Sequence, residues 1–335
     1  MSETYLVTGA AGFIGSALVK RLLEEGRVVI GLDNFNNYYS ADLKQLRINS
    51  FIGDAFSEIY DIDIENIEEL EKLIMKFRPK SVFHMAAQAG VRMPILQYDK
   101  YMRSNLSGFF NVVSISAKYN VENIFYASSS SVYGNMSTIP FNEFDMSIRP
   151  TSFYGITKFT NELIADIFSK KSGMKMRGGR FFTVYGPWGR PDMSYFRLFE
   201  SAINNRRFEL FGNGQVRRDF TYIDDVVQSC ILLERQLDNE SRGFSDVVNI
   251  GGGKPISIIE LIAKIENITG RSIDVIAREE IKEDLKLTFS DSTYRGSLIS
   301  TKEFITIDKG LAEFNNWATN EISPKELELY VDSSY

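Results

Sequence analysis

The sequence predicts an α/β fold in which a doubly wound parallel sheet carries a smaller α/β lobe. Short apolar runs alternate with amphipathic helical patterns from residue 4 to about residue 183, which is the order of a parallel sheet with crossover helices. A glycine-rich turn also joins the first apolar run to the first helical pattern. Together these two observations favour one large sheet with helices on both of its faces.

The predicted elements of this sheet follow one another along the chain. Each expected strand is apolar, and each expected helix repeats apolar residues every three or four positions. The expected strands are 4–8, RVVIGLD ending at Asp33, the run before Asp61, SVFHMAAQAG, and VENIFYASSS, and the expected helices span 12–25, about 65–77, about 97–119 and 152–171.

Composition narrows the class of protein. With 335 residues, the chain can bury roughly three quarters of its unfolded surface. A net charge of −6 argues against a nucleic-acid partner. The single cysteine, Cys230, fits a cytoplasmic protein without disulfides, and the single histidine, His84, excludes a multi-histidine metal site, so no metal is expected. Without a signal peptide or a long apolar span, we also expect no membrane association.

Glycines mark the first turn as a candidate dinucleotide site. In TGAAGFIGSAL, Gly9, Gly12 and Gly15 have the spacing GxxGxxG between the first strand and the first helix. The first glycine permits a tight turn, the second lets the backbone approach a pyrophosphate at the helix N-terminus, and the third allows close packing of helix and strand. A glycine-rich turn that serves packing alone is the alternative. The pattern predicts a Rossmann-type sheet.

An acidic residue at the end of the second strand indicates which dinucleotide binds. Asp33 lies 24 residues after Gly9, where a carboxylate can accept hydrogen bonds from both ribose hydroxyls and would repel a 2′-phosphate. This favours NAD over NADP. Asp61 and Ile62, after the third strand, can frame the adenine or simply end the strand.

A tyrosine and a lysine one helical turn apart form a candidate base. Tyr154 and Lys158, in YGITK, lie on one helix face, and Tyr154 follows Ser129 by 25 positions. Lowering the pKa of a phenol from about 10 to neutrality takes about 4 kcal/mol, and an ammonium at ~4 Å supplies about that much. An amphipathic helix with surface Tyr and Lys is the alternative for this pair taken alone.

Five motifs in this order resemble the extended short-chain dehydrogenase/reductase superfamily: TGAAGFIG, Asp33, HMAAQAG, YASSSSVYG and YGITK. They cover about the first 185 residues. Within the superfamily, GLDNFNNYYSADLKQLR, AAQAGVR and RFFTVYGPWGRPDM resemble UDP-glucuronate 4-epimerases, as do RRDFTYIDDVV and VVNIGGGKPISIIELI further on.

The resemblance implies a set of site residues. The catalytic residues would be Ser129, Tyr154 and Lys158. Cofactor-binding residues for NAD would be Gly9, Gly12, Phe13, Ile14, Gly15, Asp33, Asn34, Asp61, Ile62, Ala86, Ala87, Gln88, Asn105, Tyr154 and Lys158. Substrate-binding residues would be Arg92, Ser129, Ser130, Thr183, Arg190, Phe211 and Arg218.

The resemblance also implies a reaction, the interconversion of UDP-glucuronate and UDP-galacturonate through a transient 4-keto sugar. Tyr154 would take the O4 proton, and Ser129 would hydrogen bond to O4. Arg190, with Thr183 and Ser130, would hold the C6 carboxylate in an orientation that resists loss of carbon dioxide. Arg218 would reach the diphosphate or stand as a surface arginine, and Phe211 would stack on uracil or serve as a core aromatic.

Several alternatives stay open at this point. Related dehydratases and decarboxylases place an acidic residue before VYG, whereas this loop is Ser128-Ser129-Ser130-Ser131, which disfavours both reactions. A 4-epimerase of a neutral UDP-hexose or UDP-N-acetylhexosamine is the nearest rival. A non-catalytic NAD-binding scaffold is the alternative from another class. Lys282-Glu283-Asp284 replaces the family's usual Pro-Gly-Asp turn and leaves the role of that loop open.

We expect two lobes with a discontinuous boundary. Residues 1–183 and about 221–257 would form the NAD-binding Rossmann domain, and residues about 184–220 and 258–335 the UDP-sugar lobe. Apolar stripes on helices 97–119 and 152–171 would, by resemblance, pair in a homodimer as a four-helix bundle. Burial of part of each stripe within one chain is the competing explanation.

Overall fold

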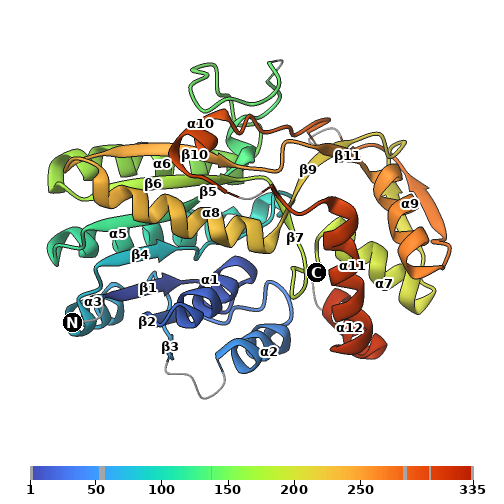
Figure 1. Ribbon diagram of the computed structural model, residues 1–335, viewed down its shortest axis with the longest axis horizontal. Coiled ribbons are helices and arrows are strands. Elements are labelled where there is room, and N and C mark those ends of the chain that lie inside the picture. Colours follow the sequence, from blue (N-terminus) through green and yellow to red (C-terminus); the bar gives the residue numbers. More distant parts are fainter. Residues whose placement is uncertain (1–2, 53–56, 137, 282–284, 302, 333–335) are drawn as a thin grey trace.

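The computed structural model describes residues 3–52, 57–136, 138–281, 285–301 and 303–332 (Figure 1). Its centre is a seven-stranded sheet in the order β10-β6-β5-β4-β1-β2-β3, in which every neighbouring pair is parallel. The strands are β1 Thr4–Thr8, β2 Val28–Asp33, β3 Ser57–Asp61, β4 Ser81–His84, β5 Asn123–Ser129, β6 Lys175–Phe181 and β10 Ser245–Ile250.

Helices cover both faces of this sheet because its strands present apolar side chains in both directions. Along β1, Tyr5 and Val7 pack into one hydrophobic cluster and Leu6 packs into a second on the opposite face. The first cluster takes in α1 (Phe13–Glu24) and α8 (Ile223–Gln236), and the second takes in α3 (Ile67–Phe77), α5 (Phe109–Lys118) and α6 (Phe153–Ser172).

Side-chain and glycine caps set the ends of α6, the helix that carries Tyr154. The Ser152 side chain accepts a hydrogen bond from the Gly155 N–H at its N-terminus, and Gly173 ends it in the left-handed conformation with φ 81°. A π-helix, Tyr101–Gly108, leads into α5 and packs beside α6. The order of these elements brings the N-terminal half of α6 to the end of β5.

Two small sheets and four helices form the region on the right of Figure 1. The strands β7 (Thr183–Tyr185), β9 (Arg217–Tyr222) and β11 (Pro255–Ser257) form one sheet, and β8 (Phe208–Phe211) pairs with β12 (Val275–Arg278) in the other. The accompanying helices are α7 (Ser194–Asn204), α9 (Ile258–Thr269), α11 (Ile307–Asn320) and α12 (Pro324–Asp332). The remaining helices are α2 (Ala41–Ile52), the single turn α4 (Tyr98–Lys100) and α10 (Thr293–Leu298).

The predicted doubly wound parallel sheet is confirmed. After β9 the chain returns to it, since α8 packs on α1 and β10 pairs with β6. The proposed domain bounds stay a prediction. In the described part of the chain, no helix has both the length and the apolar character needed to cross a membrane.

A buried ion pair fastens the last strand to the sheet and generates a stability prediction. Arg177 on β6 donates to both carboxylate oxygens of Asp246 on β10, at 2.7 and 2.8 Å. Asp246→Ala removes the nearer carboxylate and leaves the buried guanidinium with Glu240, 3.9 Å from Nη2, so it should cost about 3–5 kcal/mol of unfolding free energy and lower Tm by about 4–7 °C. Thermal unfolding measures this.

The control for this experiment is Asp166→Ala, which breaks the exposed pair of Asp166 with Lys170 on α6. Exposed pairs contribute about 1 kcal/mol or less, so its Tm should stay near that of the parent protein. Equal Tm values for the two variants would contradict the stabilising role of the Arg177–Asp246 pair.

Candidate active site

The glycine-rich turn has the geometry of a dinucleotide cradle. Gly9 adopts φ 69°, and a Cβ atom there would lie 2.7 Å from the Ala86 backbone nitrogen. A Cβ on Gly15 would collide with the Gly9 carbonyl oxygen, at 2.0 Å. The N-cap of α1, Gly12, provides no side-chain cap, and the first turn of α1 carries no acidic residue. The N–H groups of this helix end are therefore suited to phosphate oxygens.

The carboxylate of Asp33 stands at the end of β2, directly beside this turn. It accepts hydrogen bonds from the Ala11 N–H at 3.0 Å and the Phe35 N–H at 2.9 Å. Asp33 pairs in register with Asp61, and Ile62 N–H donates to the Asp33 carbonyl oxygen at 3.1 Å. The residues predicted to contact ribose and adenine thus gather at one edge of the sheet.

Asn105 supports the segment of small residues that follows β4. Its Oδ1 accepts from the Gln88 N–H at 2.8 Å, and its Nδ2 donates to the Gln88 carbonyl and to Thr157 Oγ1, both at 3.1 Å. Ala86 N–H donates to Thr8 Oγ1 at 3.1 Å. Asn105 therefore joins the segment 86–88 to α6, one residue before Lys158.

The three predicted catalytic residues meet at the carboxyl end of β5. Ser129 ends this strand, and its hydroxyl forms a hydrogen bond with Tyr154 from the first turn of α6. Lys158 is buried beneath them, with Nζ donating to the Ala127 carbonyl at 2.9 Å and lying 5.8 Å from the centroid of the Tyr154 ring. The local geometry therefore brings a hydroxyl pair and an ammonium into one small volume.

The electrostatics of this group are dominated by burial. Burial raises the pKa of Tyr154, while the positive charge of Arg190 and the hydrogen bond from Ser129 lower it. Burial lowers the pKa of Lys158 to about 8. The activating role predicted for Lys158 stays a prediction; in this structure the positive charge of Arg190 lowers the pKa of Tyr154, and Lys158 Nζ lies 5.8 Å from the centroid of its ring.

His84 is buried at the end of β4. Its Nδ1 lies 2.8 Å from Thr8 Oγ1. Burial first, and the positive charge of Lys158 second, lower the pKa of the imidazole to about 3, so it is neutral at physiological pH.

Arg190 is held by a partner that the sequence did not reveal. Its Nε donates to Asp192 Oδ1 at 3.0 Å, and Nη2 donates to Oδ2 of the same carboxylate at 2.5 Å. Tyr38 O–H also donates to Asp192 Oδ2, at 3.3 Å, and its ring lies 5.8 Å from the Arg190 guanidinium carbon. Arg190, Asp192 and Tyr38 thus form a cluster beside Tyr154.

The other residues predicted to bind substrate lie on several separate elements of the chain. The Arg92 guanidinium lies over the Phe211 ring, 5.7 Å from its centroid. Arg218 Nη1 donates to the Arg217 carbonyl at 3.0 Å and to the Leu285 carbonyl at 2.5 Å. Ser130 is buried next to Ser129, and Thr183 begins β7. Lys282-Glu283-Asp284 lies outside the described residues.

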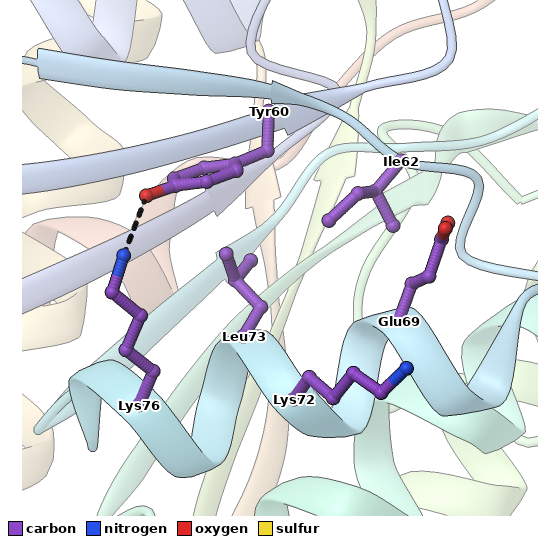
Figure 2. Close-up of a pocket in the computed structure, with 6 residues that line it drawn as sticks. All are labelled: Tyr60, Ile62, Glu69, Lys72, Leu73 and Lys76. Atoms are coloured by element: carbon purple, nitrogen blue, oxygen red, sulfur yellow. Dashed lines mark hydrogen bonds between the residues drawn. The ribbon is translucent and has the colours of Figure 1, made fainter.

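A depression of about 220 Å³ lies away from this group, between β3 and α3 (Figure 2). Tyr60, Ile62, Glu69, Lys72, Leu73 and Lys76 line it, and Lys76 donates to the Tyr60 hydroxyl at 3.2 Å. Its lining contains none of the catalytic candidates. Among the described residues, no cluster of three or more His, Cys, Asp or Glu side chains is suited to a metal ion.

Comparison with known proteins agrees with this geometry. Residues 5–251 match the model of the NAD dependent epimerase/dehydratase family. UDP-glucuronate 4-epimerase of Thermodesulfobacterium geofontis is 36% identical over 320 residues, covering 95% of this chain and 97% of the relative.

Solved structures show the same fold. The Bacillus cereus UDP-glucuronic acid 4-epimerase in complex with UDP-glucuronic acid and NAD has a TM-score of 0.87 at 30% identity, covering 97% of this chain and 99% of that one. MoeE5 in complex with UDP-glucose and NAD has a TM-score of 0.85 at 31% identity, covering 96% and 100%. The resemblance drawn from the motifs is confirmed, and the chain belongs to the NAD dependent epimerase/dehydratase family.

Proposed function

We propose that this chain is an NAD-dependent UDP-glucuronate 4-epimerase, an isomerase that interconverts UDP-glucuronate and UDP-galacturonate. The observation that carries the proposal is the position of Arg190, whose positive charge acts on the same Tyr154 hydroxyl that Ser129 contacts. A sugar whose O4 meets this hydroxyl pair would bring its C6 substituent close to a guanidinium. A carboxylate at C6 suits that cation.

The residues present fit NAD. The glycine turn leaves no room for a Cβ at Gly9 or Gly15, α1 offers uncapped N–H groups, and Asp33 presents a carboxylate at the ribose position. When bound, NAD+ supplies the acceptor for a hydride from C4 of the sugar and returns that hydride to the opposite face. The chain has to hold the sugar nucleotide while its sugar ring turns over.

In the proposed reaction, Tyr154 removes the proton from O4 and later gives it back. Ser129 hydrogen bonds to O4 and lies on the path of that proton. Arg218 and Phe211 are proposed to hold the diphosphate and uracil, so that the sugar can be released and re-presented without loss of the nucleotide. Ser130, Thr183 and Arg190 are proposed to hold the C6 carboxylate out of line with the C4 carbonyl, which suppresses decarboxylation.

A second substrate class is favoured by one observation. Asp192 already neutralises Arg190, so a sugar with an uncharged C6 hydroxymethyl would not leave an unpaired buried charge. MoeE5 has been solved with UDP-glucose as well as with UDP-glucuronic acid. A neutral UDP-hexose is therefore the candidate against which the uronate is tested.

We also propose that the chain forms a homodimer and is located in the cytoplasm. Large apolar side chains are exposed along the π-helix, α5 and α6: Met102, Phe110, Ile156, Leu163 and Ile167. These side chains give the adjacent helices an exposed apolar face, which is suited to a four-helix bundle formed with a second copy of the chain. The reduced, buried Cys230 is consistent with a cytoplasmic protein.

The first test removes the proposed base. Tyr154→Phe keeps the ring and deletes the hydroxyl, so kcat for epimerisation should fall by about 10²–10⁴-fold while NAD remains bound. Product is followed by chromatography of the two UDP-uronates, and bound NAD by its release after denaturation. Tyr60→Phe, at the edge of the sheet, is the control and should retain full activity. Activity of Tyr154→Phe near that of the parent would refute the assignment.

The second test concerns substrate choice. Arg190→Ala should lower kcat/KM for UDP-glucuronate by about 10²-fold or more, because the carboxylate loses its proposed hydrogen bonds to the guanidinium, and should affect UDP-glucose less. Since the charge of Arg190 lowers the pKa of Tyr154, the rise of kcat/KM with pH for the neutral sugar should also move to higher pH.

Arg103→Ala removes an exposed arginine of the π-helix and is the control for the Arg190 experiment. It should leave both kcat/KM values unchanged. A loss in Arg190→Ala that is equal for the two sugars would argue against recognition of the C6 carboxylate by Arg190.

The third test concerns the dimer. Ile167→Glu places a charge on the exposed apolar face of α6, so the mass in solution should fall from two chains to one chain of 38.2 kDa. Light scattering after size exclusion measures it. Leu329→Glu on α12 is matched in exposure, 56% against 59%, and should leave the dimer intact. A dimer that persists in Ile167→Glu would exclude this face as the interface.

A further inference from the structure

A single buried ion pair touches the chain on both sides of the segment that carries Ser129 and Ser130. Before this segment, Ser128 Oγ donates to Glu162 Oε1 at 2.5 Å. After it, Arg180 Nη1 donates to the Tyr133 hydroxyl at 2.9 Å. Glu162 and Arg180 are also bonded to each other, with Nε to Oε1 at 2.9 Å and Nη2 to Oε2 at 2.8 Å.

The Glu162–Arg180 pair connects α6, which carries Tyr154, to the strands next to Ser129. The two hydroxyl groups need these elements in a fixed relative position. Glu162 lies on α6, eight residues after Tyr154, and Arg180 lies on β6, directly opposite Ser128 of β5 in the sheet register. The side chains of Arg180 and Glu162 are 3% and 7% exposed. A shift of α6 relative to the sheet would therefore break two buried hydrogen bonds between charged groups.

Tyr133 is a firm anchor for the far end of the segment. Its hydroxyl accepts from Arg180 and donates to Asn249 Oδ1 on β10 at 2.7 Å. Its ring stacks on Phe141 with centroids 4.8 Å apart, and the Arg180 guanidinium carbon lies 4.8 Å from its centroid. The backbone N–H of Tyr133 donates to the Ser130 carbonyl at 3.1 Å, which closes the turn that follows Ser129.

Stability alone does not account for this arrangement. The attraction within a buried ion pair does little more than offset the free-energy cost of desolvating its two charges. Replacing such a pair with apolar residues often leaves stability unchanged. What the pair does supply is geometry, because a guanidinium and a carboxylate joined by two hydrogen bonds have one mutual orientation. Both ends of the Ser129 segment are bonded to that rigid unit.

We propose that Glu162 and Arg180 are positioning residues that hold the segment between Ser128 and Tyr133 against α6, so that Ser129 keeps its hydrogen bond with Tyr154. This inference rests on the proposed function only in assigning a reaction to the Ser129–Tyr154 pair. Ser128 and Tyr133 are the links through which the ion pair acts, and neither is assigned to substrate or cofactor.

The test uses two substitutions that spare the buried charges. Ser128→Ala removes the link to Glu162, and Tyr133→Phe removes the link to Arg180. Each should lower kcat by about 10-fold or more, since small displacements of reacting groups are costly, while bound NAD is retained.

Each substitution has a matched control of the same chemical change. Ser169→Ala removes a buried hydroxyl of α6 whose one hydrogen bond to a described residue is to the carbonyl of Asp166 in its own helix. Tyr126→Phe removes a buried hydroxyl of β5 that has no hydrogen-bond partner within the described residues. Both controls should keep the kcat of the parent protein. Parent-like kcat in Ser128→Ala and Tyr133→Phe would overturn the proposal.

A spectroscopic readout separates positioning from a general loss of stability and does not require turnover. The ultraviolet difference between each protein and its Tyr154→Phe counterpart reports the ionisation of Tyr154. Because the Ser129 hydrogen bond lowers the pKa of Tyr154, Ser128→Ala should raise that pKa and Ser169→Ala should not. An unchanged pKa would overturn the positioning role, whereas a parent protein inactive on every UDP-sugar but showing the shift would refute only the proposed function.

Discussion

The partial burial of Tyr154 is the constraint on which the rest of the site depends. A phenol partly withdrawn from water loses some of the hydration that stabilises its ionised form, so burial raises the pKa of Tyr154, where the proposed reaction requires a base. The positive charge of Arg190 and the hydrogen bond from Ser129 act in the opposite direction, since both lower that pKa. The segments that carry Arg190 and Ser129 must therefore be fixed in position relative to the Tyr154 hydroxyl.

The sequence predicted the parts of the fold that local patterns determine. The helix expected over 152–171 is α6, Phe153–Ser172, because its apolar residues repeat with the helical period, Ser152 caps its start and Gly173 ends it. The glycine turn was also readable, since Gly9 has φ 69° and no space for a side chain. The resemblance implied that Ser129 and Tyr154 belong to one site, and they do meet, at the carboxyl end of β5.

The partners of the site side chains were not predicted, because they come from loops that meet only in three dimensions. Arg190 and Asp192 lie in the loop before α7, where no helix or strand period places their side chains together, and Tyr38 comes from the loop after β2. Glu162 did leave a signal, as it stands four residues after Lys158 on the same face of α6. Its partner Arg180 could be identified only from the pairing of β5 with β6.

The pairing of Arg190 with Asp192 changes how a C6 group would be recognised. An arginine without a partner would favour a carboxylate over a hydroxymethyl chiefly by charge. Asp192 takes the edge of the guanidinium formed by Nε and Nη2, so its charge is already balanced before any sugar arrives. A uronate would then gain through hydrogen bonds to the Nη1 side and to Ser130 and Thr183, which depend on orientation more than on net charge. Discrimination between acidic and neutral sugars would accordingly reside in the fit of the C6 group, and in the proposed reaction that same fit would keep the carboxylate of a 4-keto uronate from aligning for loss of carbon dioxide.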